Sequence, residues 1–282
     1  MKKILLFIIS LALLLTFTSC KGGNKKPYET YTYGKYPQAK LSDKTIIDEL
    51  NKLTDDAKNS DGYFVYEGKE YAKVLANPRY EYYPASDGSY IYRDKYYYFI
   101  VDKIIWRVLK KDNNIRYLIS DNILYSVDYF TNLETTEYSY STSNIRSFLI
   151  NDFYNTAFSS ETNKPLQTEI EIDTYNSKIK LNDSVWLPSV YDIDSKNNGF
   201  YSDDDRFTSS TDYATASGIL LNVDSPNSYF YRCSPYATST VVELEEKYIY
   251  YIDIYGKNDI SNSRDILDKI GVRPCIRIET KN

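Results

Sequence analysis

The sequence contains no histidine among its 282 residues, and this absence excludes several kinds of site at once. A Ser-His-Asp or Cys-His nucleophilic centre, a histidine-ligated metal and an imidazole pH sensor all need a side chain that the chain lacks. Basic residues are in the minority, because 34 Lys and Arg stand against 39 Asp and Glu, for a net charge of −5. Nucleic acid is therefore not expected as a partner, since its binding needs a basic face. No motif in the sequence indicates a cofactor.

The N-terminal residues have the layout of an export signal. Two lysines precede an almost uncharged run from Ile4 to Phe17, which is shorter than the ~20 residues that a membrane-spanning helix needs. The run ends in Thr-Ser-Cys at Cys20 and resembles the lipobox of bacterial lipoproteins, with Phe where Leu is usual. We therefore predict a signal peptide over 1–19 and a lipidated Cys20 that starts a flexible tether over 20–27 and attaches the protein to a membrane of the bacterial envelope. An ordinary signal peptide that ends near a cysteine is the alternative.

Tyrosine is unusually abundant, with 32 residues in the chain. It occurs in runs such as Tyr80 to Tyr83, Tyr96 to Tyr98 and Tyr248 to Tyr251. Tyrosine favours strands and combines an apolar ring with a polar tip, so a group of tyrosines suits a sugar-binding or protein-binding surface. Adjacent tyrosines in a strand point to opposite faces, so the alternative is that they fill half-buried sheet positions.

The pattern of apolar residues predicts two helices among many strands. The first helix is expected within 42–62, with Ser42 as its cap, and the second over 143–158. Strand-rich runs occupy most of the remaining sequence, including a hairpin whose turn lies at 111–114. We therefore predict one α+β domain over 28–282, with short antiparallel strands and two main helices.

Several short blocks follow one another along this region. They are Trp106-Arg107-Val108-Leu109, Ser143 to Leu149, Asp152 to Phe158, Trp186-Leu187-Pro188-Ser189, Thr211-Asp212-Tyr213-Ala214, Arg232-Cys233-Ser234-Pro235 and Gly271-Val272-Arg273-Pro274. Their order resembles the bacterial domain-of-unknown-function family DUF6273, and Tyr33 to Gln38 resembles its opening motif, so that the resemblance covers about residues 31–278. The family is similar to the formylglycine-generating-enzyme and C-type-lectin-like folds, which implies a loop-rich α+β domain with ligands bound on long loops. The resemblance implies no reaction.

Cys233 and Cys275 are the two cysteines of the predicted domain. The oxygen-dependent enzymes of the larger fold group use two closely spaced cysteines, and these two lie far apart in the sequence, so that chemistry is not expected. The stretches 231–236 and 271–278 suit two neighbouring buried strands, which would bring the two side chains within reach of a disulfide in an exported protein. Two separate buried thiols are the alternative, and a soft metal held by two thiolates is a weaker one.

Three arginines in these blocks, Arg146, Arg232 and Arg273, are expected to reach carboxylates in the core, because Arg suits buried bidentate pairing. Asp152 and Asp212 are the acids that we expect them to meet. The group is either a structural ion-pair network or a pocket for an anionic or polar ligand.

Two other groups of acids are weaker candidates for a site. Asp203, Asp204 and Asp205 offer the oxygen ligands that calcium prefers, although acids are also ordinary in a first helical turn. Paired carboxylates such as Glu169 and Glu171 are the residue type that glycoside hydrolysis needs.

Together these features favour a lipid-anchored cell-surface protein that binds an extracellular glycan or protein through tyrosine-rich loops. An envelope enzyme is the alternative, and it would use carboxylate acid–base chemistry because histidine is absent. A purely structural envelope lipoprotein is a third interpretation.

Overall fold

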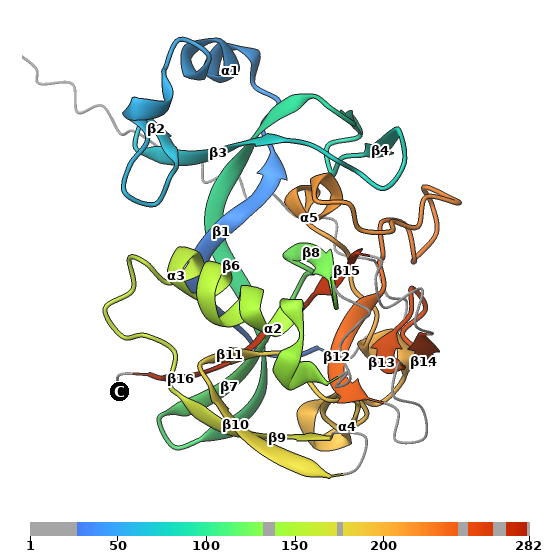
Figure 1. Cartoon of the computed structure of the whole chain (residues 1–282). Coiled ribbons are helices and arrows are strands. Elements are labelled where there is room, and N and C mark those ends of the chain that lie inside the picture. The colour runs from blue at the N-terminus through green and yellow to red at the C-terminus, as the bar shows by residue number, and fades with distance from the viewer. Residues whose placement is uncertain (1–26, 132–138, 174–176, 242–247, 262–268, 281–282) are drawn as a thin grey trace, which may run out of the picture.

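The computed structural model describes residues 27–131, 139–173, 177–241, 248–261 and 269–280. The predicted signal peptide and Cys20 lie outside this part of the chain. The described residues form an α+β structure with many short antiparallel strands and few helices (Figure 1), as the sequence predicts. None of the described helices is long and apolar enough to cross a membrane.

The strands divide into two larger sheets and two small ones. The strands are β1 (Thr30–Lys40), β2 (Phe64–Tyr66), β3 (Lys69–Leu75), β4 (Tyr82–Pro84), β5 (Tyr90–Tyr92), β6 (Tyr96–Asp112), β7 (Ile115–Ser120), β8 (Tyr125–Asp128), β9 (Thr168–Asp173), β10 (Lys178–Asp183), β11 (Val185–Trp186), β12 (Tyr236–Val241), β13 (Ile249–Ile252), β14 (Asn258–Ser261), β15 (Lys269–Val272) and β16 (Cys275–Glu279). The helices are α1 (Lys44–Leu50), α2 (Asn144–Phe148), α3 (Tyr154–Ala157), α4 (Val190–Ile193) and α5 (Asp212–Ala216). Short helical turns are η1 (Asp55–Ala57), η2 (Tyr140–Thr142), η3 (Leu149–Phe153), η4 (Lys196–Asn198) and η5 (Asp203–Asp205).

The larger sheet is built around the long strand β6. Its order is β11-β16-β7-β6-β3-β2, with β1 also paired to β6, and its pairs are antiparallel. The predicted hairpin turn is confirmed, because β6 ends at Asp112 and β7 starts at Ile115. Asn113 adopts φ +51° there, a left-handed conformation that Asn tolerates better than most residues.

The second sheet has the order β14-β13-β12-β15-β8. The strands β12 and β15 run parallel, and Tyr236 lies opposite Gly271, so the two C-terminal stretches are neighbours as the sequence predicts. A Cβ atom at Gly271 would lie 2.6 Å from the carbonyl oxygen of Pro235 and 2.9 Å from Ile123 Cγ2. Glycine therefore allows the two backbones to approach this closely.

The two predicted helices differ in how well the sequence located them. The second is confirmed, since α2, η3 and α3 form one helical run that starts after Ser143, whose Oγ accepts a hydrogen bond from the backbone N–H of Arg146 at 3.2 Å. The first is shorter than predicted, because α1 ends at Leu50. Its cap is Asp43 instead of Ser42, whose hydroxyl donates to Asp87.

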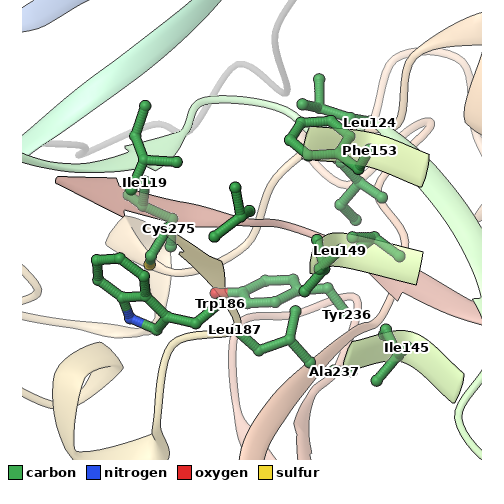
Figure 2. Packing of buried hydrophobic residues seen from close by; sticks show 14 of the residues in the cluster. Ile119, Leu124, Ile145, Leu149, Phe153, Trp186, Leu187, Tyr236, Ala237 and Cys275 are labelled. Carbon is green, nitrogen blue, oxygen red and sulfur yellow. The ribbon is translucent and has the colours of Figure 1, made fainter. Parts of the chain in front are cut away.

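The main core lies where the helical run meets strands of both sheets. The run contributes Ile145, Leu149 and Phe153 to the same core cluster as Tyr236 and Ala237 of β12 (Figure 2). The further members shown there are Ile119, Leu124, Trp186, Leu187 and Cys275. Burial of these side chains, at about 25 cal/mol per Å² of apolar surface, joins the two sheets and the helical run.

We expect Gly271→Ala to lower the free energy of unfolding by about 2 to 3 kcal/mol, because its methyl group has no room beside Pro235 and the core neighbours must shift. Val65→Ala, at an exposed position of β2, is the control and should change it by less than about 0.5 kcal/mol. Urea denaturation of the two variants measures both values. Equal stabilities would contradict the close approach of β12 and β15.

Candidate functional site

Two of the sequence-predicted charged residues, Asp212 and Arg232, form a fully buried ion pair. Asp212 is the first residue of α5 and Arg232 lies in the loop before β12, and their Oδ1 and Nη2 atoms are 2.7 Å apart. The two side chains are only 1% and 6% exposed. Arg232 adopts φ +63°, an uncommon conformation for a residue with a side chain, so surrounding interactions must hold it. One of them is the hydrogen bond from its backbone N–H to Asn222 O at 2.8 Å.

The ion pair also holds the hairpin formed by β4 and β5. Arg232 Nη1 donates to the carbonyl oxygen of Pro84, at the end of β4. Asp212 accepts hydrogen bonds from the backbone N–H of Ser86 at 2.8 Å, from the Ser86 hydroxyl at 2.7 Å and from the Lys40 N–H at 2.9 Å. Buried donors and acceptors that are paired in this way fix the position of the hairpin relative to α5 and β1.

The space beside this ion pair is too small for an organic ligand. The cavity measures about 20 Å³ and is lined by polar side chains that include Gln38, Asn122 and Ser209. A volume of this size accommodates about one water molecule. Of the two predicted roles for the charged group, the geometry at Asp212 and Arg232 favours the structural ion pair.

Arg146 has a carboxylate partner, but it is not the predicted one. Its Nε and Nη2 atoms donate to the two carboxylate oxygens of Asp183, at 2.8 Å each. The prediction that Asp152 joins the arginines is wrong, because Asp152 is exposed to solvent while Asp183 is buried at the end of β10. The sequence could not show this, because β10 and α2 approach each other only in the folded chain.

Arg273 is buried, and its hydrogen bonds go to neutral groups. Its guanidinium donates to the carbonyl oxygens of Ser120 at 2.9 Å and Arg206 at 3.0 Å, and to the Tyr236 hydroxyl at 3.0 Å. Within the described residues it forms no ion pair with a carboxylate, so the expectation that it reaches one is wrong. Arg273 therefore cross-links backbone segments instead of balancing an acid.

A third buried arginine, Arg107, is not among the residues that the sequence singled out, although it belongs to one of the sequence blocks. Its Nη1 donates to Asp205 O at 2.9 Å and its Nη2 to Gly199 O, while its guanidinium lies 4.4 Å from the ring centre of Tyr28 and 4.2 Å from that of Phe200. Burial lowers the pKa of the Arg107 guanidinium, and the nearby charge of Arg273 lowers it further. The sequence does indicate that Arg107 is buried, because it directly follows a tryptophan within an apolar strand segment.

The predicted disulfide between Cys233 and Cys275 is not present, because Cys275 is a free buried thiol. Cys275 lies in β16 of the larger sheet, opposite Trp186, whereas Cys233 packs beside Phe207 in a separate small cluster. The two stretches are neighbours through β12 and β15, but β16 continues into the other sheet and carries Cys275 away. Burial raises the pKa of the Cys275 thiol well above its ordinary value, so it is not a reactive thiolate.

The acidic candidates do not converge on a metal site. Asp203 pairs with Arg206 at 2.6 Å, while the carboxylate of Asp205 accepts hydrogen bonds from the backbone N–H groups of Tyr201 and Ser202. Asp204 lies between them in η5. In the part of the chain that the structure describes, no three His, Cys, Asp or Glu side chains are grouped to hold a metal ion.

Glu169 and Glu171, the paired carboxylates of β9, do not face each other across a cleft. They form ion pairs with Lys180 at 2.7 Å and Lys178 at 2.8 Å on β10, the neighbouring strand. The four side chains are more than half exposed, so these are surface cross-strand pairs.

The β4–β5 hairpin presents its aromatic residues to solvent. Tyr83 and Ile91 point inward and are 1% and 0% exposed, whereas Tyr82, Tyr90 and Tyr92 point outward and are 50%, 47% and 38% exposed. The ring centres of the outward tyrosines lie 5.3 Å (Tyr82 to Tyr90), 5.6 Å (Tyr82 to Tyr92) and 6.2 Å (Tyr90 to Tyr92) apart. We call Tyr82, Tyr90 and Tyr92 the tyrosine face. It is a preformed aromatic surface held by contacts between its own rings.

The turn that closes this hairpin is also fixed. Burial alone would raise the pKa of Asp87, but hydrogen bonds from Ser42 and Ser89 and the charge of Lys40 outweigh burial and lower the pKa to about 2. A carboxyl whose pKa is lowered by folding stabilises the fold above its unfolded pKa of ~3.9, and this stabilisation is lost as the pH falls through about 2. At neutral pH the ionised Asp87 therefore helps to attach the turn to β1 and the segment that follows it.

We expect Asp212→Ala to lower the free energy of unfolding by about 3 to 5 kcal/mol, because it leaves Arg232 buried without its carboxylate and frees the N–H groups of Ser86 and Lys40. The control Asp203→Ala removes a half-exposed ion pair and should cost at most about 1 kcal/mol. Chemical denaturation gives both values. Asp212→Ala combined with Arg232→Met should be more stable than Asp212→Ala alone, and equal losses for Asp212→Ala and Asp203→Ala would contradict the central role of the buried pair.

Comparison with known protein families gives a match to the second half of the chain. The model of the family described as a domain of unknown function (DUF6273) matches residues 113–280, which include Asp212, Arg232 and Arg273. The tyrosine face and the predicted opening motif at Tyr33 to Gln38 lie before the matched range. No curated protein and no solved structure matches the chain. Because the match covers more than half of its length, the chain belongs to the DUF6273 family.

Proposed function

We propose that this protein is a lipid-anchored polysaccharide-binding protein of the bacterial cell envelope and that the tyrosine face is its binding surface. The observation that carries this proposal is the outward presentation of Tyr82, Tyr90 and Tyr92 on one side of a hairpin whose other side is fully buried. Tyr80, whose ring centre lies 5.6 Å from that of Tyr83, and Tyr96 are exposed as well, at 59% and 65%. Single apolar residues scattered over a protein surface are ordinary, whereas a contiguous group of exposed aromatic side chains is typical of an interaction site.

Stacked tyrosines suit sugars for chemical reasons. Each ring offers a flat apolar face to the C–H groups of a sugar, and its hydroxyl offers a hydrogen bond to the sugar's polar edge. Tyrosine loses little conformational entropy on binding, and contacts among the three rings reduce that loss further. A stable protein partner usually covers about 800 Å² on each side, whereas this face consists of three rings on two three-residue strands. A narrow polymer therefore fits it better than a protein surface does.

The buried acids give the alternative, an envelope enzyme, less support than the tyrosine face gives a binding protein. Asp183, Asp205 and Asp212 each accept hydrogen bonds from an arginine or from backbone N–H groups. These hydrogen bonds engage the carboxylate oxygens within the fold, whereas a catalytic carboxyl must reach the substrate with a free oxygen. The buried acids of the described chain therefore suit structural roles.

The cellular setting of the proposal comes from the N-terminal sequence. We propose a signal peptide over 1–19, a lipid on Cys20, a tether over 20–27 and one binding domain over 28–282. A tether of this length would leave the domain close to the membrane on the outward side of the envelope or in the periplasm. The finer architecture that we propose is C-type-lectin-like, in keeping with short strands, long connections and a ligand surface away from the main sheets.

We expect replacement of Tyr82, Tyr90 and Tyr92 by Ala to weaken polysaccharide binding by about tenfold or more, because the stacking surfaces are lost. The full chain in detergent is tested against a panel of immobilised polysaccharides. Tyr191→Ala and Tyr229→Ala remove exposed rings elsewhere and serve as the matched control. The proposal would be overturned if the unmodified protein bound none of the polysaccharides, or if the tyrosine-face variant and the control variant bound them equally well.

We expect labelled palmitate to enter the protein in growing bacteria and to be absent from the Cys20→Ala variant, because the lipid is attached through the Cys20 thiol. Cys275→Ala is the control, since Cys275 is a buried thiol within the fold. Gel autoradiography reads the label directly. Equal label in Cys20→Ala and the unmodified protein would contradict lipidation at Cys20.

A further inference from the structure

A hollow with cationic walls lies at the open end of the β4–β5 hairpin. It measures about 370 Å³, and its charged lining consists of Arg79, Arg93, Lys269 and Asp128. Three cationic side chains therefore face one carboxylate, in a chain whose overall charge is −5. We call this hollow the cationic basin. The described side chains that line it are mostly cationic, so it favours an anionic group.

Backbone carbonyl groups hold two of these cations in place. Arg93 donates through Nε and Nη2 to the carbonyl oxygen of Pro78 at 3.3 Å and 2.8 Å, and Lys269 Nζ donates to Ser217 O at 2.7 Å. Within the described residues, neither Arg93 nor Lys269 forms an ion pair with a carboxylate. Carbonyl oxygens orient these groups without neutralising their charge, which leaves both available to an anion.

The cationic basin is continuous with the tyrosine face along the chain. Arg93 directly follows Tyr92, and its backbone N–H bonds to Glu81 O at 2.9 Å, one residue before Tyr82. The Tyr82–Tyr92 pair is thus the part of the tyrosine face nearest to the basin. In Figure 1 the hairpin lies beside α5, and β8 and β15, which carry Asp128 and Lys269, lie below α5.

We propose that the polymer bound by the tyrosine face is an anionic polysaccharide, whose sugar rings stack on the tyrosines while its carboxylate or phosphate groups occupy the cationic basin. This inference rests on the proposed function and adds the charge of the ligand to it. Uronic acid polymers and phosphodiester-linked polymers share this chemistry. Single-stranded nucleic acid also combines rings with negative charge, but proteins bind it along a positively charged groove that follows its backbone, whereas here the cations gather in one basin.

The test compares charged and neutral forms of one polymer. The full chain in detergent is titrated with polygalacturonate, fully methyl-esterified polygalacturonate, phosphorylated dextran, dextran and oligo-deoxythymidine. We expect polygalacturonate or phosphorylated dextran to bind about tenfold more tightly than its neutral counterpart at 50 mM salt, and this preference to fall at 500 mM salt. Which anionic polymer binds distinguishes a carboxylate ligand from a phosphate ligand.

Two sets of variants separate this inference from the proposed function. Arg93→Gln with Lys269→Gln removes both charges but keeps hydrogen-bond donors, and it should abolish the preference while leaving binding of the neutral polymer unchanged. Lys52→Gln, an exposed lysine of the segment after α1, is the matched control and should keep the preference. The Tyr82, Tyr90 and Tyr92 variant should weaken the charged and neutral polymers together.

Each contrary outcome has a distinct meaning. Equal affinity of the unmodified protein for charged and neutral polymers, or a preference that survives Arg93→Gln with Lys269→Gln, would overturn the anionic ligand alone. Tighter binding of oligo-deoxythymidine than of any polysaccharide would replace it with nucleic acid. Binding of every polymer without dependence on the tyrosines would instead overturn the proposed function.

Discussion

The buried ion pair between Asp212 and Arg232 is the interaction on which the arrangement of this protein depends. It joins α5, the loop before β12, the end of β1 and the β4–β5 hairpin through one carboxylate and one guanidinium. A buried pair is favourable only when its remaining donors and acceptors are satisfied, and here Asp212 accepts from Ser86 and Lys40 as well as from Arg232. The same contacts that satisfy the pair therefore fix the hairpin in place.

This arrangement links the family-matched part of the chain to a part outside the match. Asp212 and Arg232 lie within residues 113–280, whereas the tyrosine face lies in residues 82–92. The matched part thus supplies the support, and the earlier part supplies the exposed surface. Outward positions such as Tyr82, Tyr90 and Tyr92 can therefore be substituted without disturbing the buried anchor.

The arginines show two different uses of the same side chain. Arg146 and Arg232 pair with buried carboxylates, whereas Arg107 and Arg273 donate to backbone carbonyl oxygens, among them those of Asp205 and Ser120. A protein rich in loops has many such carbonyl groups, and the five donors of a guanidinium satisfy several at once. Buried arginine is therefore a means of holding irregular backbone together here, and at Arg93 the same contacts orient a charge toward solvent.

The sequence by itself determined the α+β class, the helical run after Ser143, the hairpin turn at 111–114 and the DUF6273 family, because each depends on local periodicity, capping or the order of short blocks. It also indicated that adjacent tyrosines separate into inward and outward sets, as Tyr82 and Tyr83 do. Only the tertiary structure decided the partner of Arg146, the separation of Cys233 from Cys275 and the cationic basin beside the tyrosine face. These features depend on which segments, distant in the sequence, come into contact in the fold. Residue spacing along the chain does not specify those contacts.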